Sequence, residues 1–102
     1  MTQDEKEMAV KQFINEFKRI YFTGSFSEGA IKNDLHTKKL LDICSGSNAL
    51  WEKKQFYFKN FEDNTALIDK CQSLLPYGHE LIYQLERCKV ALKILREVVE
   101  SF

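Results

Sequence analysis

The last quarter of the chain, HELIYQLERCKVALKILREVVESF from His79 to Phe102, decides the fold. It contains neither Gly nor Pro, and its apolar residues recur at alternating steps of four and three. That is the period of a helix seam that packs lengthwise against other helices. The seam consists of Leu81, Leu85, Cys88, Leu92, Leu95, Val99 and Phe102. The pattern predicts one long helix.

The same segment carries a second apolar line, formed by Tyr83, Val90 and Ile94, on roughly the opposite side of the helix. One helix cannot lay both lines against a single neighbour. Either the helix lies centrally in a bundle, or one line is exposed and binds a partner. The sequence leaves these two alternatives open.

Composition favours a helical fold. A chain of 102 residues fits one domain, which we expect to span residues 1–102. Hydrophobic residues make up 44% and aromatic residues 13%, more than disordered chains contain. Four Gly and one Pro are fewer than the turns of a sheet protein normally use.

The charge is balanced overall and polarised locally. Fifteen basic and fifteen acidic residues give a net charge of zero, whereas nucleic-acid binders usually carry a basic surplus. Residues 32–59 hold six Lys against three carboxylates, and residues 60–80 hold one Lys against four carboxylates. Such polarity is typical of solvated surfaces, and it can also orient a charged protein partner.

The cysteines and the absence of long apolar runs predict a soluble protein of the cytoplasm. Cys44, Cys71 and Cys88 are an odd number and show no CxxC spacing, so a disulfide scaffold is not expected. We see no signal peptide in the first thirty residues and no run near the ~18 apolar residues of a membrane span. We therefore expect a reducing compartment, no membrane association, and thiols that serve as small core residues.

The first helix is predicted from Thr2, which forms a capping-box pattern with Glu5, to Thr23-Gly24, where Gly would adopt a left-handed cap. Its apolar residues lie in one stripe, so we expect it on the outside of the bundle. The stripe is Val10, Phe13, Ile14, Phe17, Ile20 and Tyr21.

Residues 25–46 are the least coherent part of the sequence. If one helix ran from Ser27 to Cys44, Ile31 and Leu35 would point one way, while Leu40, Leu41 and Cys44 would point the other. A straight helix with one buried face does not explain this pattern. We therefore expect a loop through residues 24–29 and a short helix from about residue 33 to 44.

Residues 48–75 contain neither Gly nor Pro and predict a long helix. A new cap is conceivable at Asp63-Asn64-Thr65, and the aromatic residues at 55–61 leave a strand as the alternative. The core stripe is Leu50, Tyr57, Phe61, Ile68, Cys71 and Leu75. Pro76 and Gly78 then predict an antiparallel hairpin. The predicted fold is all-α: a small antiparallel up-and-down bundle of three to four helices with a long C-terminal helical hairpin.

Catalytic patterns are missing from the sequence. His36 and His79 are the only imidazoles, and no Glu-x-x-His, His-x-x-x-His or CxxC pattern occurs. His79 reads as a residue at the start of the last helix. We therefore predict no catalytic residue, no metal and no cofactor, and a protein that is not an enzyme.

The leading hypothesis is a non-enzymatic protein-interaction module of adaptor, chaperone or inhibitor type. Its motivation is surplus apolar surface on two helices and the polarised charge. The predicted partner-binding residues are Trp51, Phe58, Tyr83, Val90 and Ile94, and the predicted charged rim is Lys53, Lys54 and Lys59.

Two alternatives remain from sequence. The last helix can complete its core in a homodimer, which concentration-dependent thermal stability would reveal. The Lys and aromatic residues of segment 51–61 can also bind nucleic acid weakly, by stacking on bases and neutralising phosphates. We expect core packing to account for most of this segment, because Tyr57 and Phe61 fall in the core stripe.

Overall fold

The computed structural model describes residues 2–102 and contains four helices, with no strand in that range. They are α1 (Gln3–Tyr21), α2 (Glu28–Ser45), α3 (Ala49–Ser73) and α4 (Glu80–Glu100). The all-α bundle with a long C-terminal hairpin is confirmed. The alternative strand at residues 55–61 is wrong, because these residues lie inside α3.

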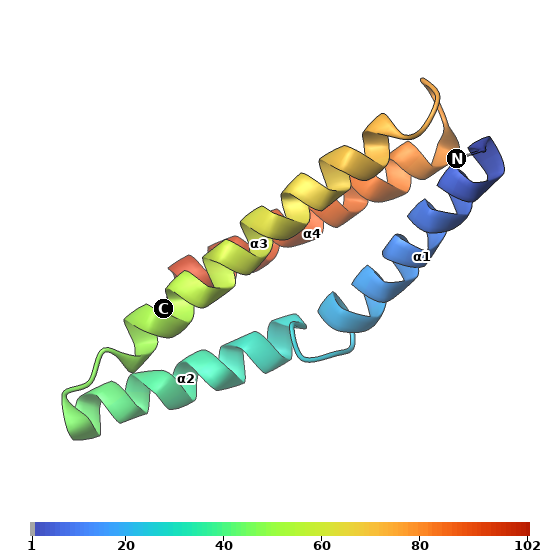
Figure 1. Ribbon diagram of the computed structural model, residues 1–102. Helices are drawn as coiled ribbons and strands as arrows, with labels where there is room; N and C mark the ends of the chain where they lie inside the picture. The colour runs from blue at the N-terminus through green and yellow to red at the C-terminus, as the bar shows by residue number, and fades with distance from the viewer. Residues whose placement is uncertain (1) are drawn as a thin grey trace.

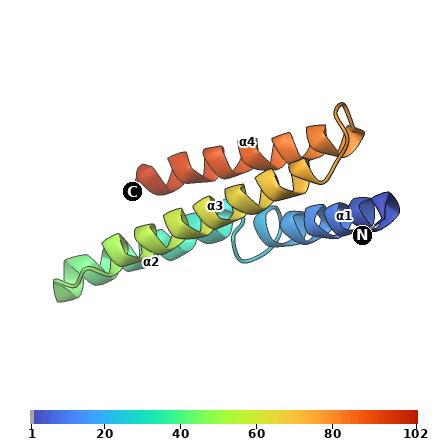
Figure 2. The same ribbon diagram turned by 45° about the horizontal axis from the view of Figure 1, so that its top comes forward.

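The molecule is elongated, with extents of 55 × 20 × 20 Å. Figure 1 shows α1 and α2 arranged one after the other along α3, with α4 antiparallel to α3. α4 packs against α3, α1 and α2. The far end of the α2–α3 hairpin projects beyond the C-terminal end of α4 (Figure 2). The bundle is therefore three helices thick over most of its length and only two helices thick at that end.

The α4 seam forms the centre of the core. Six of its residues are buried, and Phe102 is half-buried against the cluster. The second apolar line of Tyr83, Val90 and Ile94 is exposed. The structure therefore settles which line is core: the heptad-like line packs inside, and the opposite line faces outward.

The first helix begins as predicted, with the Thr2 hydroxyl accepting a hydrogen bond from the backbone N–H of Glu5 at 3.2 Å. Its end differs from the prediction. α1 ends at Tyr21, and Gly24 does not adopt a positive φ, so it is not a left-handed cap. Gly24 is needed for another reason: a Cβ there would lie 2.4 Å from the carbonyl oxygen of Arg19.

We expect Gly24→Ala to lower the free energy of unfolding by about 1–3 kcal/mol, because backbone atoms must move to admit the methyl group. Gly29→Ala is the matched control, since no atom lies within 4 Å of its Cβ position and it sits inside α2. That control should be neutral or stabilising by about 0.5–1 kcal/mol. Urea unfolding of both variants measures the difference, and equal effects would contradict the close approach at Gly24.

α2 departs most from the sequence prediction. It is one helix from Glu28, five residues before the predicted start, and the Ser27 hydroxyl caps it by accepting from the N–H of Ala30 at 3.5 Å. The prediction was wrong because it required every apolar residue of a helix to be covered. In the structure the helix continues past its buried residues Ile31 and Leu35 and leaves its second half exposed. Cys44, expected in the core, is exposed there as well.

α3 runs without a break through residues 63–65. The side chains of Asn64 and Thr65 donate hydrogen bonds back to the carbonyls of Asn60 and Phe61, at 2.9 and 2.8 Å. Bonds of this kind are made by polar side chains inside a helix, whereas a cap would accept from the following N–H groups. With 25 residues, α3 is the longest helix in residues 2–102.

Candidate functional site

The clearest uncovered surface is the end of the α2–α3 hairpin. We define the hairpin tip as residues 36–56, which comprise the second half of α2, the turn and the first two turns of α3. None of these side chains is buried. Ile43 is 73% exposed and Trp51 is 64% exposed. The other large exposed apolar residues of the tip are Leu40, Leu41 and Phe56. Five large apolar side chains are thus exposed within 21 residues of the chain.

The tip is uncovered because α4 stops short of it. Along the α3–α4 pair, Lys89 forms an ion pair with Asp69 at 2.6 Å, and the Arg96 guanidinium lies over the Phe58 ring at 4.9 Å. α4 then ends at Glu100, one turn after Arg96. Nothing in the described chain continues α4 along the first turns of α3 (Figures 1 and 2).

The turn of the hairpin is held in place by Asp42. One carboxylate oxygen accepts a hydrogen bond from the Ser47 hydroxyl at 2.9 Å, and the other accepts from the N–H of Leu50 at 3.1 Å. The second bond caps the positive end of α3. Asn48, at the N-cap position itself, makes no capping bond with its side chain. The exposed apolar residues therefore stand on an ordered scaffold.

We expect Asp42→Ala to lower the free energy of unfolding by about 1 kcal/mol, because α3 loses its cap. Asn48→Ala is the matched control in the same turn, and its effect should stay within about 0.5 kcal/mol. Amide hydrogen exchange at the start of α3 should speed up only in the first variant. A larger loss for Asn48→Ala would show that the cap is assigned to the wrong residue.

A polar cluster of Asp34, Lys53 and Tyr57 lies between α2 and α3, where the tip joins the rest of the bundle. The Tyr57 hydroxyl donates to Asp34 at 2.8 Å, and Lys53 lies 3.4 Å from the same carboxylate and 4.6 Å from the centre of the Phe56 ring. Burial, followed by the hydrogen bond to Asp34, raises the pKa of Tyr57. The hydroxyl therefore stays protonated and donating at neutral pH.

Two of the three lysines of the predicted charged rim form ion pairs, and the third does not. Lys53 is engaged with Asp34, and Lys59 pairs with Asp63 at 3.5 Å. Lys54 has no carboxylate within 4 Å in residues 2–102, and the same holds for Lys38 and Lys39. The unpaired positive charge of this region thus lies at Lys38, Lys39 and Lys54.

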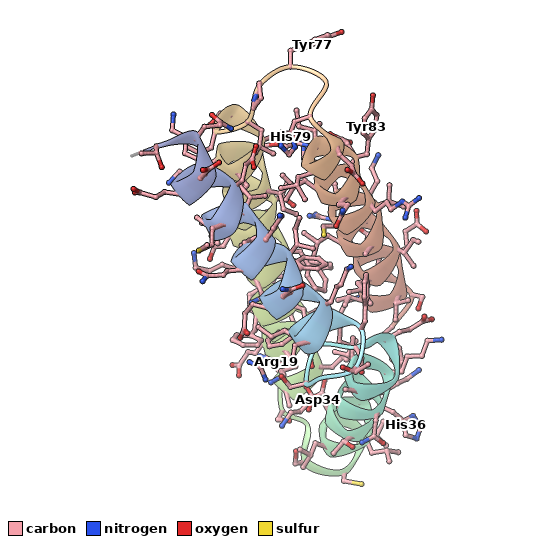
Figure 3. The ribbon with its side chains drawn as sticks, turned by 90° about the vertical axis from the view of Figure 1, so that its right-hand side faces the viewer. Arg19, Asp34, His36, Tyr77, His79 and Tyr83 are labelled. Carbon is pink, nitrogen blue, oxygen red and sulfur yellow. The ribbon has the colours of Figure 1, made fainter. Side chains whose placement is uncertain are left out.

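The predicted partner-binding residues do not form one surface. Trp51 lies at the tip, and Phe58 is half-buried beneath Arg96. The start of α4 lies beside Gln72, which donates to the carbonyl of Ile82 at 3.5 Å. Gln72 follows Trp51 by 21 residues of α3, a separation of about 31 Å. Figure 3 shows Tyr83 pointing away from the neighbouring helices at that end.

Val90 borders a shallow groove of about 480 Å³ between α3 and α4. Charged residues of its walls form ion pairs between the two helices: Arg96 approaches Glu62 at 3.9 Å, and Lys89 binds Asp69, which lies outside the groove lining, at 2.6 Å. Ile94 lies on the other flank of α4, beside Phe22. On the outer line of α4 (Tyr83, Val90 and Ile94), Val90 and Ile94 are one turn apart and border different hollows, and Tyr83 lies about two turns before Val90.

His79 has a structural position. Its Nδ1 accepts the N–H of Leu81 at 3.0 Å and so caps α4, which leaves Nε2–H to donate to the Glu7 carboxylate at 2.8 Å. The bond joins residues 72 positions apart and ties α1 to the start of α4 (Figure 3). It also lowers the pKa of Glu7. His36 lies apart from it, exposed on α2.

We expect Glu7→Gln to lower stability at neutral pH, because Gln keeps the acceptor and loses the charge. A lowered folded-state pKa stabilises the protein fully above the ordinary value of 4.5, and this contribution disappears as pH falls through the lowered pKa of Glu7. The difference between variant and wild type should therefore shrink on acidification, as thermal unfolding at several pH values would measure. Glu97→Gln, which removes an exposed carboxylate without an ion pair in residues 2–102, is the control. A difference that grows at acid pH would contradict the assignment.

The remaining reactive groups show no activation. Burial raises the pKa of the Cys71 and Cys88 thiols, so both stay protonated at neutral pH. Within residues 2–102, no three His, Cys, Asp or Glu side chains gather as a metal site would require. None of the helices in this range is long and apolar enough to cross a membrane.

Comparison with family models, curated proteins and solved structures finds no match. Sequence reasoning did not assign Leu40, Leu41 and Ile43 to a site. All three fall inside the helix predicted from about residue 33 to 44. The two-faced apolar pattern of residues 25–46 was used to shorten that helix and not to predict an exposed face on it.

Proposed function

We propose that this protein is a non-enzymatic protein-interaction module that binds a protein partner through the hairpin tip. The observation that carries the proposal is the tip itself: an ordered two-helix end, 21 residues long, with no buried side chain and with Ile43 and Trp51 more than 60% exposed. Exposed aromatic and aliphatic side chains at the centre of a patch are typical of residues that dominate binding energy. An adaptor, chaperone or inhibitor acts in this way.

The binding takes place in the reducing cytoplasm on this proposal. Cys44 lies exposed on the tip as a free thiol, and Cys71 and Cys88 are also free. Exposed thiols persist in reduced form where glutathione and thioredoxin act. The nucleic-acid alternative has less support, because Lys53 and Lys59 of segment 51–61 are paired with carboxylates.

Affinity capture with three forms of the protein tests the proposal. The baits are the wild type, a tip variant (Ile43→Gln with Trp51→Gln) and an α4 variant (Val90→Gln with Ile94→Gln), each used on nuclease-treated native lysate. We expect a protein captured by the wild type and the α4 variant and lost with the tip variant. Loss with the α4 variant alone would move the binding surface to the outer line of α4. Identical capture by all three baits would show that the partner binds neither the tip nor the outer line of α4.

A further inference from the structure

The tip has one face that lies in line with α4. Trp51 precedes Phe58 by seven residues, so it lies on the same side of α3, the side on which Arg96 of α4 rests. On α2, Glu28 borders a hollow together with Ala91 and Ile94 of α4.

Two further residues of α2 occupy the same side. Lys39 and Ile43 follow Glu28 by 11 and 15 residues, which is close to three and four turns. Ile43 from α2 and Trp51 from α3 therefore flank the path that α4 would take if it continued. Within residues 2–102 no third helix covers this position, and 73% of Ile43 and 64% of Trp51 are exposed.

The charge of this face has one sign. Lys39 lies on the α4 side of α2, and Lys54 lies one turn after Trp51 on α3. Neither has a carboxylate within 4 Å in residues 2–102. The two carboxylates of the tip do not offset them, because Asp42 is bound to the turn and Glu52 lies about a quarter-turn further around α3 than Trp51.

We propose that this face binds an amphipathic helix of the protein partner, with an apolar stripe on Ile43 and Trp51 and acidic side chains toward Lys39 and Lys54. The bound helix continues the line of α4 and completes a three-helix layer at the tip. The inference rests on the proposed function and adds the chemistry of the partner. A second copy of this chain fits less well, because two tips would bring their unpaired lysines together.

A display library of random peptides of about 20 residues, enough for five helical turns, tests the proposal without a known partner. Selected peptides are expected to carry apolar residues at helical spacing flanked by Asp and Glu. Binding should shift the emission of Trp51, the single tryptophan of the chain, to shorter wavelengths. Lys39→Glu with Lys54→Glu should weaken the selected peptides by about tenfold or more. Lys70→Glu, an exposed charge reversal near the far end of α3, should leave their affinity unchanged.

Each contrary outcome overturns the acidic-helix partner. These outcomes are selection of neutral or basic peptides, no enrichment, or binding that ignores the two charge reversals. A Trp51 shift caused by phosphatidylserine vesicles would assign the face to a membrane, and a dimer lost in Ile43→Gln would assign it to a second copy. A partner captured through the tip that contacts it without an acidic helix would leave the proposed function standing and remove only this inference.

Discussion

Leu85→Ala is expected to lower the free energy of unfolding by about 2–5 kcal/mol, the range for removing a fully buried leucine side chain. Leu85 is 0% exposed and lies in the α4 seam that packs between the other helices. Domains of this size have a total stability of about 5–15 kcal/mol, so the loss is a large part of the whole. Urea unfolding followed by far-ultraviolet circular dichroism measures it.

Val90→Ala is the matched control on the opposite side of the same helix. Val90 is exposed, and alanine has the higher helix propensity, so the effect should stay within about 0.5 kcal/mol. A cost for Val90→Ala equal to that of Leu85→Ala would mean that both lines of α4 are covered. In that case the helix would be central in a larger assembly.

The double substitution of Ile43→Gln and Trp51→Gln is expected to have the largest effect on binding. Removing two central apolar side chains from an interface commonly costs several kcal/mol, so partner affinity should fall by about 100-fold or more. The free energy of unfolding should change by less than about 1 kcal/mol, because both side chains are mostly in water before binding. Calorimetric titration of the captured partner and urea unfolding of the variant give the two numbers.

Leu67→Gln is the control for this pair, since Leu67 is an exposed apolar residue of α3 outside the tip. It should leave partner affinity unchanged. If the tip substitutions instead unfolded the protein, the tip would be part of a core that forms only with a second copy. If they changed neither stability nor affinity, the partner would bind elsewhere.

The sequence predicted the parts of the fold in which a single helix face meets the core. On α4, the heptad-like line from Leu81 to Val99 is buried, because a seam at the helical period has one way to pack. On α1, the Thr2 cap and four buried residues of the predicted stripe also appear. The lack of Gly and Pro correctly favoured a long third helix, and Pro76 and Gly78 marked the hairpin turn.

The sequence was less informative wherever an element breaks the rule that apolar residues are covered. The helix was predicted to begin at about residue 33 instead of Glu28, since Leu40 and Leu41 lie on a different side from Ile31. Its second half was predicted as helical, but no exposed apolar face was predicted for it. The bond from His79 to Glu7 and the cap of α3 by Asp42 depend on how helices meet, which residue spacing does not encode. The lengths of α3 and α4 could be predicted from the sequence. Whether α4 covers the tip depends on how the two helices are aligned lengthwise, and the sequence does not show that alignment.

The fluorescence emission of Trp51 tests the central claim, that the tip is uncovered in the isolated chain and covered by a partner. The chain has no other tryptophan, so the signal reports this position alone. The account predicts the emission of a solvated indole at every protein concentration and a shift to shorter wavelengths when the captured partner is added. A buried-indole emission that depends on protein concentration, or a spectrum unchanged by the partner, would contradict it.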